Sequence, residues 1–236
     1  NRSKTETYAV FLSDPHIGSK FFMEEELNDF IKWMSSADPI ARKIRFVVIG
    51  GDLIDGVGVF PNQDKVLEQM TTEEQLGKTF EILDRIPKHM KVFLIPGNHD
   101  AGRKALPQPA LPKMYNSELW DRENFFMLGN PSMVSLNGVK VLMYHGQSID
   151  DVVRTTPGVS YDKPAAVMRH FLKARHMSPI YGSRTPIAPE TEDMMVIDDV
   201  PDIFHSGHVH FVGLDMYKGV LIVNSGAWQR QTDFQE

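Results

Sequence analysis

Five short apolar segments of this sequence are each followed at once by aspartate, asparagine or histidine. In chain order, the segments end in Asp14-Pro15-His16, Gly51-Asp52-Leu53-Ile54-Asp55, Gly97-Asn98-His99-Asp100, His145-Gly146 and Gly207-His208-Val209-His210. The carboxyl ends of strands are where open α/β sheets bind their ligands. Any one of these groups fits a turn or a helix cap equally well, but five of them in one chain predict a shared site.

The residue types in the five groups suit particular metal ions. Carboxylates and imidazoles without thiolates favour Mn²⁺, Fe or Zn²⁺, and the chain contains no cysteine. Two ions about 3.5–4 Å apart, bridged by a carboxylate, form a known catalytic arrangement, and the five groups hold enough donors for it. Residues i and i+2 of an extended chain point to the same side. We therefore expect Asp14 with His16, and His208 with His210, each to converge on one point.

Apolar periodicity in the first half predicts the elements that position these residues. The expected strands span residues 7–13, 44–49 and 91–95, with helices between them at about 24–35 and 64–86. This alternating order favours a largely parallel sheet with helices packed on it.

The second half has a different pattern. Asn137-Gly138 and Lys218-Gly219 each join two apolar runs and predict β-hairpins. A helix is expected at about 164–176, and the proline-rich segment 103–114 predicts a surface loop. We therefore expect an α/β fold with two packed mixed β-sheets flanked by helices, in a single domain over residues 1–236.

Composition limits the class of protein. The net charge of −6 gives no overall basic signature of a nucleic-acid binder, although metal ions bound to acidic residues would reverse the local field. The absence of cysteine suits a reducing cytoplasm. There is neither a signal peptide nor an apolar run of the roughly 20 residues that span a bilayer, so we expect a cytoplasmic protein without membrane attachment. The first and last residues, Asn1 and Glu236, suggest a fragment of a longer chain.

The five groups, in this order over residues 14–210, resemble the motifs of calcineurin-like metallophosphoesterases. The stretches SDPHIGSKFF, GDLIDGVGVFPNQ, PGNHDAGRKALPQP and PIYGSRTPIAPE resemble more closely the small subunit of archaeal family D DNA polymerases. In that family the domain is a 3′→5′ proofreading exonuclease, preceded by an oligonucleotide-binding-fold domain. The resemblance implies DNA replication as the process, and DNA, as single-stranded 3′ ends, and a large polymerase subunit as partners.

The resemblance also implies a site with two divalent metal ions, Mn²⁺ above all, with Fe and Zn²⁺ as other candidates. Asp52 would bridge the two ions as a carboxylate. The other expected ligands are Asp14, His16 and His210 for one ion, and Asn98, His145 and His208 for the other. No motif position is substituted, so the resemblance implies a catalytically competent site.

Two further residues are expected to act in catalysis. The resemblance places His99 against the leaving oxygen as a general acid or transition-state stabiliser. Asp100 would fix the tautomer of His99 and keep it protonated.

Contacts with DNA are predicted from basic and aromatic residues. Arg184 lies in a segment shared with the resembled family, and Arg103, Arg169 and Lys173 could also follow a single-stranded backbone. A solvated helix face is the alternative for Arg169 and Lys173. Phe21, Phe22 and Phe60 could stack bases, or could pack in the core or at its rim.

Two other functions remain open at this point. The chain could be a non-catalytic assembly subunit, as in eukaryotic replicative polymerases whose small subunits have lost metal ligands. It could also be a phosphoesterase with another substrate, such as a repair nuclease, a cyclic-nucleotide diesterase or a phosphomonoesterase, because the same two-ion chemistry serves them all.

Overall fold

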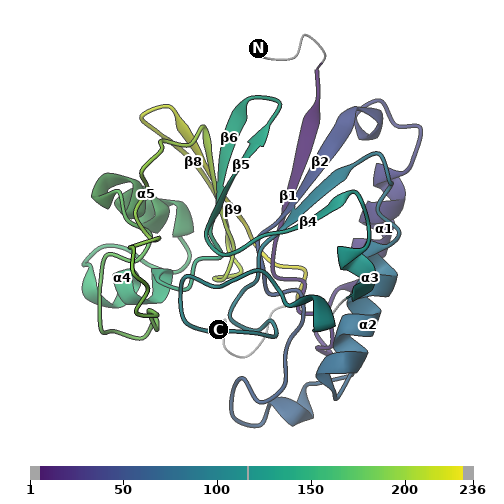
Figure 1. Cartoon of the computed structure of the whole chain (residues 1–236), viewed down its shortest axis with the longest axis horizontal. Helices are drawn as coiled ribbons and strands as arrows, with labels where there is room; N and C mark the ends of the chain where they lie inside the picture. Colours follow the sequence, from purple (N-terminus) through teal and green to yellow (C-terminus); the bar gives the residue numbers. More distant parts are fainter. Residues whose placement is uncertain (1–5, 116, 231–236) are drawn as a thin grey trace.

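The computed structural model describes residues 6–115 and 117–230, which form two β-sheets packed face to face with helices on their outer sides (Figure 1). The first sheet has the strand order β1-β2-β3-β4 and is parallel throughout. The second has the order β5-β6-β7-β9-β8 and is mixed. The predicted α/β fold of two packed sheets flanked by helices is confirmed.

The first sheet and its helices come from the first half of the chain. Their bounds are β1 Tyr8–Leu12, α1 Glu24–Met34, β2 Ile44–Ile49, α2 Thr72–Leu83, β3 Lys91–Leu94, α3 Ser117–Trp120 and β4 Phe125–Met127. Helix α2 is shorter than predicted because Thr71 and Glu74 form a capping box that starts it there. Residues 63–65 form a separate 3₁₀ turn. Strand β4 was not predicted, since three residues are too few to show a period.

The second sheet contains both predicted hairpins. Its elements are β5 Ser132–Leu136, β6 Val139–Met143, α4 Ile149–Thr155, α5 Pro164–Ala174, β7 Ile203–Ser206, β8 Val212–Tyr217 and β9 Val220–Ser225. Asn137 and Gly138 have φ angles of 50° and 87°, and Lys218 and Gly219 have 47° and 86°. Positive φ at both central residues is what a two-residue hairpin turn requires. The two hairpin predictions are therefore confirmed.

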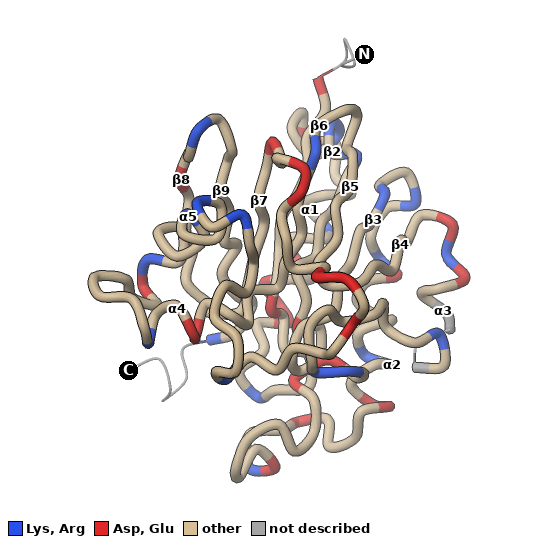
Figure 2. The backbone as a smooth tube through the Cα atoms, turned by 60° about the vertical axis from the view of Figure 1, so that its left-hand side comes forward, with Lys and Arg blue, Asp and Glu red and all other residues tan. Residues whose placement is uncertain are grey.

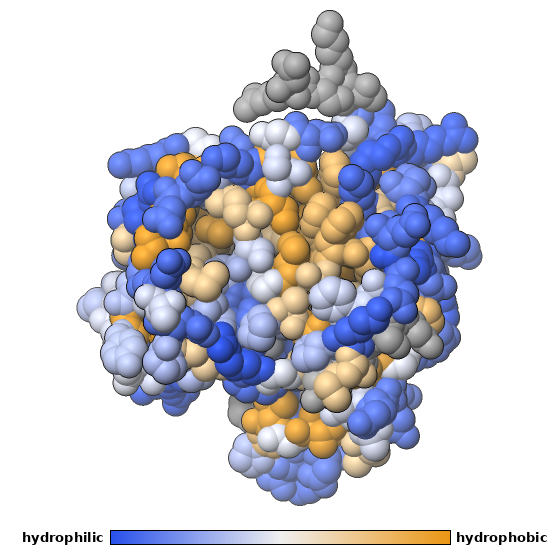
Figure 3. All heavy atoms as spheres, in the orientation of Figure 1, coloured by the Kyte–Doolittle hydropathy of each residue, from blue (hydrophilic) through white to orange (hydrophobic). Residues whose placement is uncertain are grey.

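The inner faces of the two sheets pack through a layer of aliphatic and aromatic side chains. Val48 of the first sheet and Ile95, which directly follows β3, pack against Leu136, Val141 and Met143 of the second sheet. Figure 3 shows hydrophobic residues in the region between the two sheets, with hydrophilic residues around the rim. This layer holds the two sheets together, so the strand ends of one sheet keep a fixed position relative to those of the other.

The segment predicted as a surface loop at 103–114 is partly buried, which corrects that prediction. Leu106 and Gln108 are buried. The Gln108 amide donates to the Gly97 carbonyl at 3.0 Å, and its oxygen accepts from Asn130 at 2.7 Å. The side chains of Leu106 and Gln108 therefore join the core although no strand or helix carries them.

Among the described residues, no helix has both the length and the apolar character that crossing a membrane would need.

Candidate metal centre

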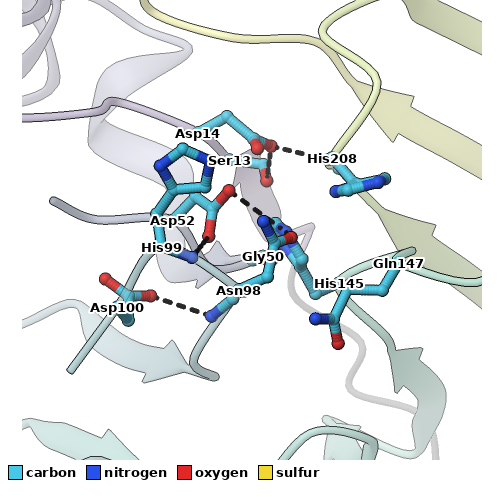
Figure 4. A network of polar contacts seen from close by, with 12 residues as sticks. Ser13, Asp14, Gly50, Asp52, Asn98, His99, Asp100, His145, Gln147 and His208 are labelled. Carbon is cyan, nitrogen blue, oxygen red and sulfur yellow. Dashed lines mark hydrogen bonds and ion pairs between the residues drawn. The ribbon is translucent and has the colours of Figure 1, made fainter. Parts of the chain in front are cut away.

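The predicted metal ligands meet where β1, β2, β3, β6 and β7 end. Figure 4 labels five of them: Asp14, Asp52, Asn98, His145 and His208. Donor atoms of Asp14, His16 and His210 lie within 4.8 Å of one another. Those of Asp52, His145 and His208 form a second group at the same spacing. Asn98 joins the second group, with its side-chain oxygen 3.0 Å from His145 Nε2. The chain thus gathers all seven predicted donors in two adjoining groups.

Asp52 lies between the two groups. Its Oδ2 is 3.7 Å from His16 Nε2 and 3.3 Å from His145 Nε2, so one carboxylate oxygen faces a donor of each group. Its Oδ1 accepts a hydrogen bond of 2.8 Å from the backbone N–H of His99. This is the geometry that a carboxylate bridging two cations needs.

Asp14 shows that the donor set fits a cation. Its Oδ2 accepts hydrogen bonds from the Ser13 hydroxyl and from the backbone N–H of His208. Its Oδ1 is buried and accepts no hydrogen bond from the described residues. His210 Nε2 lies 3.6 Å from this oxygen and His16 Nε2 lies 3.8 Å from it. A buried carboxylate oxygen without a partner is costly, and a cation held among these three side chains would satisfy it.

Two imidazoles of the centre are each oriented by a contact at one ring nitrogen. His16 Nδ1 is 3.0 Å from Asp55 Oδ1, and His145 Nδ1 is 2.8 Å from the Gly50 carbonyl. Such outer partners fix the tautomer of a metal-binding histidine and leave the other nitrogen for the ion. For His16 and His145 the remaining nitrogen, Nε2, is the one that faces the other donors.

Sequence reasoning missed two residues that support the centre. Asp55 was recognised as part of a motif, without a role, and it holds His16. Asp150 was not singled out, and its Oδ2 is 3.4 Å from His208 Nε2. A signal did exist for Asp150, because two consecutive acids follow the His145 strand end within one short segment.

The backbone at the ligands differs from the extended form that was predicted. Five of the expected ligands have left-handed φ angles: Asp14 at 52°, His16 at 49°, Asp52 at 50°, His208 at 74° and His210 at 60°. Non-glycine residues rarely adopt this region, and such conformations cluster at functional sites. These side chains are therefore oriented by tight turns at the strand ends and not by the alternation of an extended chain. His208 and His210 point into different donor groups as a result.

Gly97 is required by the close approach of two strand ends. A Cβ at this position would lie 2.2 Å from Asp52 Oδ1 and 2.7 Å from His145 Cε1. Any side chain there would displace the bridging carboxylate, so only glycine allows β2 and β6 to bring these two donors together.

His99 and Asp100 are arranged differently from the expectation. The Asp100 carboxylate accepts hydrogen bonds from the backbone N–H groups of Gly97, Leu53 and Ile54. His99 Nδ1 lies 2.7 Å from the Asp55 carbonyl. The expected pairing of the two side chains is therefore wrong: a backbone carbonyl orients His99, and Asp100 braces the turns that carry Asp52 and Asn98. Burial raises the pKa of Asp100 to about 6.

Charges in the centre balance one another. Burial lowers the pKa of His145, but the negative charge of Asp52 outweighs burial and raises that pKa to about 10. Burial raises the pKa of Asp52, but the nearby His145 and His99 outweigh it and hold that pKa well below its usual value. A cation entering this cluster would displace protons from the imidazoles.

The four basic residues predicted to contact DNA lie outside the cavity that the donors line, as far as the described residues show. Arg169 pairs with Asp215, and Arg103 pairs with Glu190 at 2.7 Å. Arg184 is exposed and is held through its backbone by Asp151, and Lys173 is exposed on α5. Figure 2 shows Lys and Arg spread over the fold in that view rather than gathered in one patch. Their expected role in binding DNA stays a prediction.

A family model for the B subunit of DNA polymerases alpha and epsilon matches residues 9–211, which include every donor of the centre. The chain belongs to this family. The predicted resemblance to archaeal polymerase small subunits is confirmed by curated relatives named DNA polymerase II small subunit. The protein from Archaeoglobus fulgidus is 48% identical over 99% of this chain and 49% of its own length. That from Methanothermobacter thermautotrophicus is 42% identical over 96% of this chain and 48% of its own length.

The chain thus spans about half the length of the curated relatives it matches. Among solved structures, the Escherichia coli phosphoesterase Yfce overlaps 95% of this chain and 82% of its own, with 15% identity and a TM-score of 0.45. An archaeal phosphodiesterase overlaps 93% of this chain and 83% of its own, with 15% identity and a TM-score of 0.43.

Proposed function

We propose that this chain is a two-metal phosphodiesterase that removes nucleotides from the 3′ end of DNA within a polymerase small subunit. The observation that carries the proposal is the arrangement of the carboxylate oxygens of Asp14 and Asp52 at the centre. Asp14 Oδ1 is buried without a hydrogen bond from the described residues, and Asp52 Oδ2 faces donors of both groups. The relatives' name, DNA polymerase II small subunit, supports DNA as substrate and a larger polymerase subunit as partner.

The donor set also supports the choice of ion. Asp14, His16 and His210 would hold one ion, and Asn98, His145 and His208 the other, with Asp52 between them. An all-oxygen-and-nitrogen set suits Mn²⁺, and also Fe or Zn²⁺. When bound, two such ions supply positive charge that stabilises the phosphate and lower the pKa of a water molecule.

His99 is the residue to which we assign proton transfer. Its Nδ1–H donates to the Asp55 carbonyl, which leaves Nε2 as the atom that can carry a proton to the departing 3′ oxygen. Its ring lies 4.6 Å from that of His16, and His99 forms a third close group of possible donors with His16 and Asp55, next to the two predicted metal sites. Asp100 contributes indirectly, by holding the turns around it.

The decisive experiment is a digest of 5′-labelled single-stranded DNA by this chain with Mn²⁺. We expect a descending ladder that releases nucleoside 5′-monophosphates. His99→Ala should lower kcat by roughly 10²–10⁴-fold while Mn²⁺ binding, measured by calorimetry, is kept. His89→Ala is the matched control, because His89 is exposed and lies outside the donor cavity.

Three outcomes would contradict parts of the proposal. Internal cuts without a ladder would indicate an endonuclease, and loss of Mn²⁺ binding in the His99 variant would make that residue a ligand. Absence of cleavage in a preparation that binds Mn²⁺ would support a non-catalytic assembly role.

A further inference from the structure

Two cavities flank His99, and they differ in chemistry. The first, of about 330 Å³, opens beside the donor groups. The second, of about 720 Å³, lies on the other side of Asn98 and His99, which line both. A residue placed to protonate a leaving oxygen should stand between the two halves of the cleaved substrate. The two cavities offer one compartment for each half.

The lining of the first cavity includes two phenylalanine rings in addition to the donors. Apart from the donors, and from Asp55 and His99, the cavity is lined by Ser19, Phe21, Phe60, Val66 and Gln229. Phe21 and Phe60 are both half-buried, and the Phe60 ring lies 6.4 Å from that of His99. A phosphate alone requires no apolar wall, so these rings indicate a ligand with an aromatic part next to its phosphate.

Phe21 is held in place by the strand-like pairing of its segment. Its neighbour Phe22 packs against the core of the first half and pairs with Gln229, while Phe21 lines the cavity. The Phe21 carbonyl accepts from the Arg230 backbone at 2.8 Å, and the Gln229 amide donates to the Ser19 hydroxyl at 3.1 Å. The structure therefore separates the two phenylalanines that sequence alone left together: Phe22 belongs to the core and Phe21 to the cavity.

Phe60 is tied to the donor groups through Gln63. The buried Gln63 side chain accepts from the Val59 backbone at 2.8 Å and donates to the Asp55 carboxylate at 2.7 Å. The same carboxylate orients His16. The loop that carries Phe60 is therefore fixed relative to the metal ligands, as a substrate-positioning wall should be.

The second cavity has polar groups suited to a nucleic-acid strand. Lys104 and Gln147 line it together with Asn98 and His99, and its lining also includes the acidic residues Glu73 and Asp100. The Gln147 side-chain oxygen is buried and accepts no hydrogen bond from the described residues. Lys104 Nζ donates to the Asp100 carbonyl at 2.6 Å, which keeps the positive charge next to the centre.

We propose that the first cavity binds the nucleobase of the 3′-terminal nucleotide by stacking on Phe21 and Phe60, and that the shortened strand leaves through the second. This inference rests on the proposed exonuclease function. A terminal base must leave its pair to enter the cavity, so the site takes unpaired ends.

The test compares two single-stranded oligonucleotides that differ only in whether the 3′-terminal nucleotide carries its base or is abasic. Base–aromatic stacking contributes about 1–3 kcal/mol per base, so wild type should cleave the natural end roughly ten-fold more efficiently. Phe21→Leu/Phe60→Leu should reduce that preference to about two-fold or less, because leucine keeps apolar volume without a ring. Phe126→Leu is the matched control, an exposed phenylalanine outside the cavity.

A variant of the second cavity provides the contrast. Lys104→Gln should weaken binding of natural and abasic strands equally and lower the salt dependence, leaving the preference for a base unchanged. Equal cleavage of the two substrates by wild type would overturn the base-binding inference while leaving the exonuclease proposal standing.

A second readout keeps the inference separate from catalysis. An oligonucleotide with 2-aminopurine as its 3′-terminal base should lose fluorescence on binding to wild type with Ca²⁺, through stacking, and lose less with the double phenylalanine variant. If neither strand is cleaved but this quenching occurs, the base site stands and the exonuclease proposal fails. Unquenched binding would refute the base site.

Discussion

The two sheets contribute different chemistry to one centre. Strands β1, β2 and β3 of the first sheet deliver both carboxylates, the Asn98 amide and one imidazole. Strands β6 and β7 of the second deliver imidazoles alone, from His145, His208 and His210. Each donor group contains members from both sheets, so neither is complete until the sheets pack. The centre is therefore a product of tertiary packing, and its geometry depends on the layer between the sheets.

The two sheets also differ in how their donors are held. On the first sheet, His16 is oriented by Asp55 and Asp14 by Ser13, all from the same half of the chain. The second-sheet donors have contacts from both halves of the chain. The first half supplies the Gly50 carbonyl to His145 Nδ1 and the Asp14 carboxylate to the His208 backbone N–H. The second half supplies Asn130 to the His145 backbone and Asp150 to His208 Nε2. The second-sheet imidazoles are therefore positioned by contacts within their own half and by contacts across the two sheets.

The largest effect is expected from Asp52→Asn, which removes the charge that faces both groups. Replacing a residue that only orients a metal ligand lowers metal affinity by roughly 10–100-fold. Replacing a donor that bridges both ions should lower that affinity by at least as much. We expect nuclease activity to fall to background and calorimetric Mn²⁺ binding to weaken at both sites. The control is Asp64→Asn at an exposed position. Normal Mn²⁺ affinity in the Asp52 variant would show that the two sheets do not share a bridged site.

Asp55→Asn and Asp150→Asn compare the supports of the two sheets directly. Asp55 is buried and lies 3.0 Å from His16, whereas Asp150 is less buried and lies 3.4 Å from His208. Both variants should lose metal affinity within the roughly 10–100-fold range of such partners, with the larger loss for Asp55. In a stepwise Mn²⁺ titration, Asp55→Asn should weaken one step and Asp150→Asn the other. Asp199→Asn, at an exposed residue, is the control. Loss of the same step in both variants would contradict the assignment of His16 and His208 to different groups.

Asn130→Ala tests the connection that positions His145. The buried Asn130 oxygen accepts from the His145 backbone at 3.0 Å, and its amide donates to Gln108 at 2.7 Å. Leaving these buried groups unpaired should cost about 1–3 kcal/mol of unfolding free energy, measured by denaturant titration. Asn137→Gly is the control, because Asn137 sits at a positive φ that glycine accepts. A change no larger than that of the control would mean that the Asn130 contacts do not stabilise the fold.

Much of the fold and the identity of the donors could be predicted from the sequence. Apolar runs revealed β2 at its observed bounds, and Asn137-Gly138 revealed a hairpin, because both signals are local. The gathering of Asp14 with His210 across nearly the whole chain followed from a family pattern, since spacing alone does not fix which strand ends meet.

Other features depend on contacts that no local pattern encodes. The left-handed backbone at Asp14 and His208 replaces the extended form that alternation suggested, because the packed sheets dictate where each turn must aim. Asp100 was expected to pair with its sequence neighbour His99, yet its carboxylate accepts hydrogen bonds from three backbone N–H groups. The separation of Phe21 from Phe22 depends on pairing with residue 229, at the far end of the described chain.

The smallest effect is expected from Gly77→Ala, which tests whether the two sheets unfold together. Gly77 lies within α2, on the outer side of the first sheet, and a Cβ there meets no atom within 4 Å. Alanine should stabilise the helix by about 0.5–1 kcal/mol because glycine loses more backbone entropy on folding.

If the shared donor groups and the layer between the sheets make the fold cooperative, probes in both halves should report the same increase in the free energy of unfolding. Tryptophan fluorescence can report on the first half, because Trp33, Trp120 and Trp228 all pack against its core. Amide exchange of β6 and β9 can report on the second half. A shift confined to the first half would mean that the sheets unfold separately and that the metal centre is lost before the first sheet is.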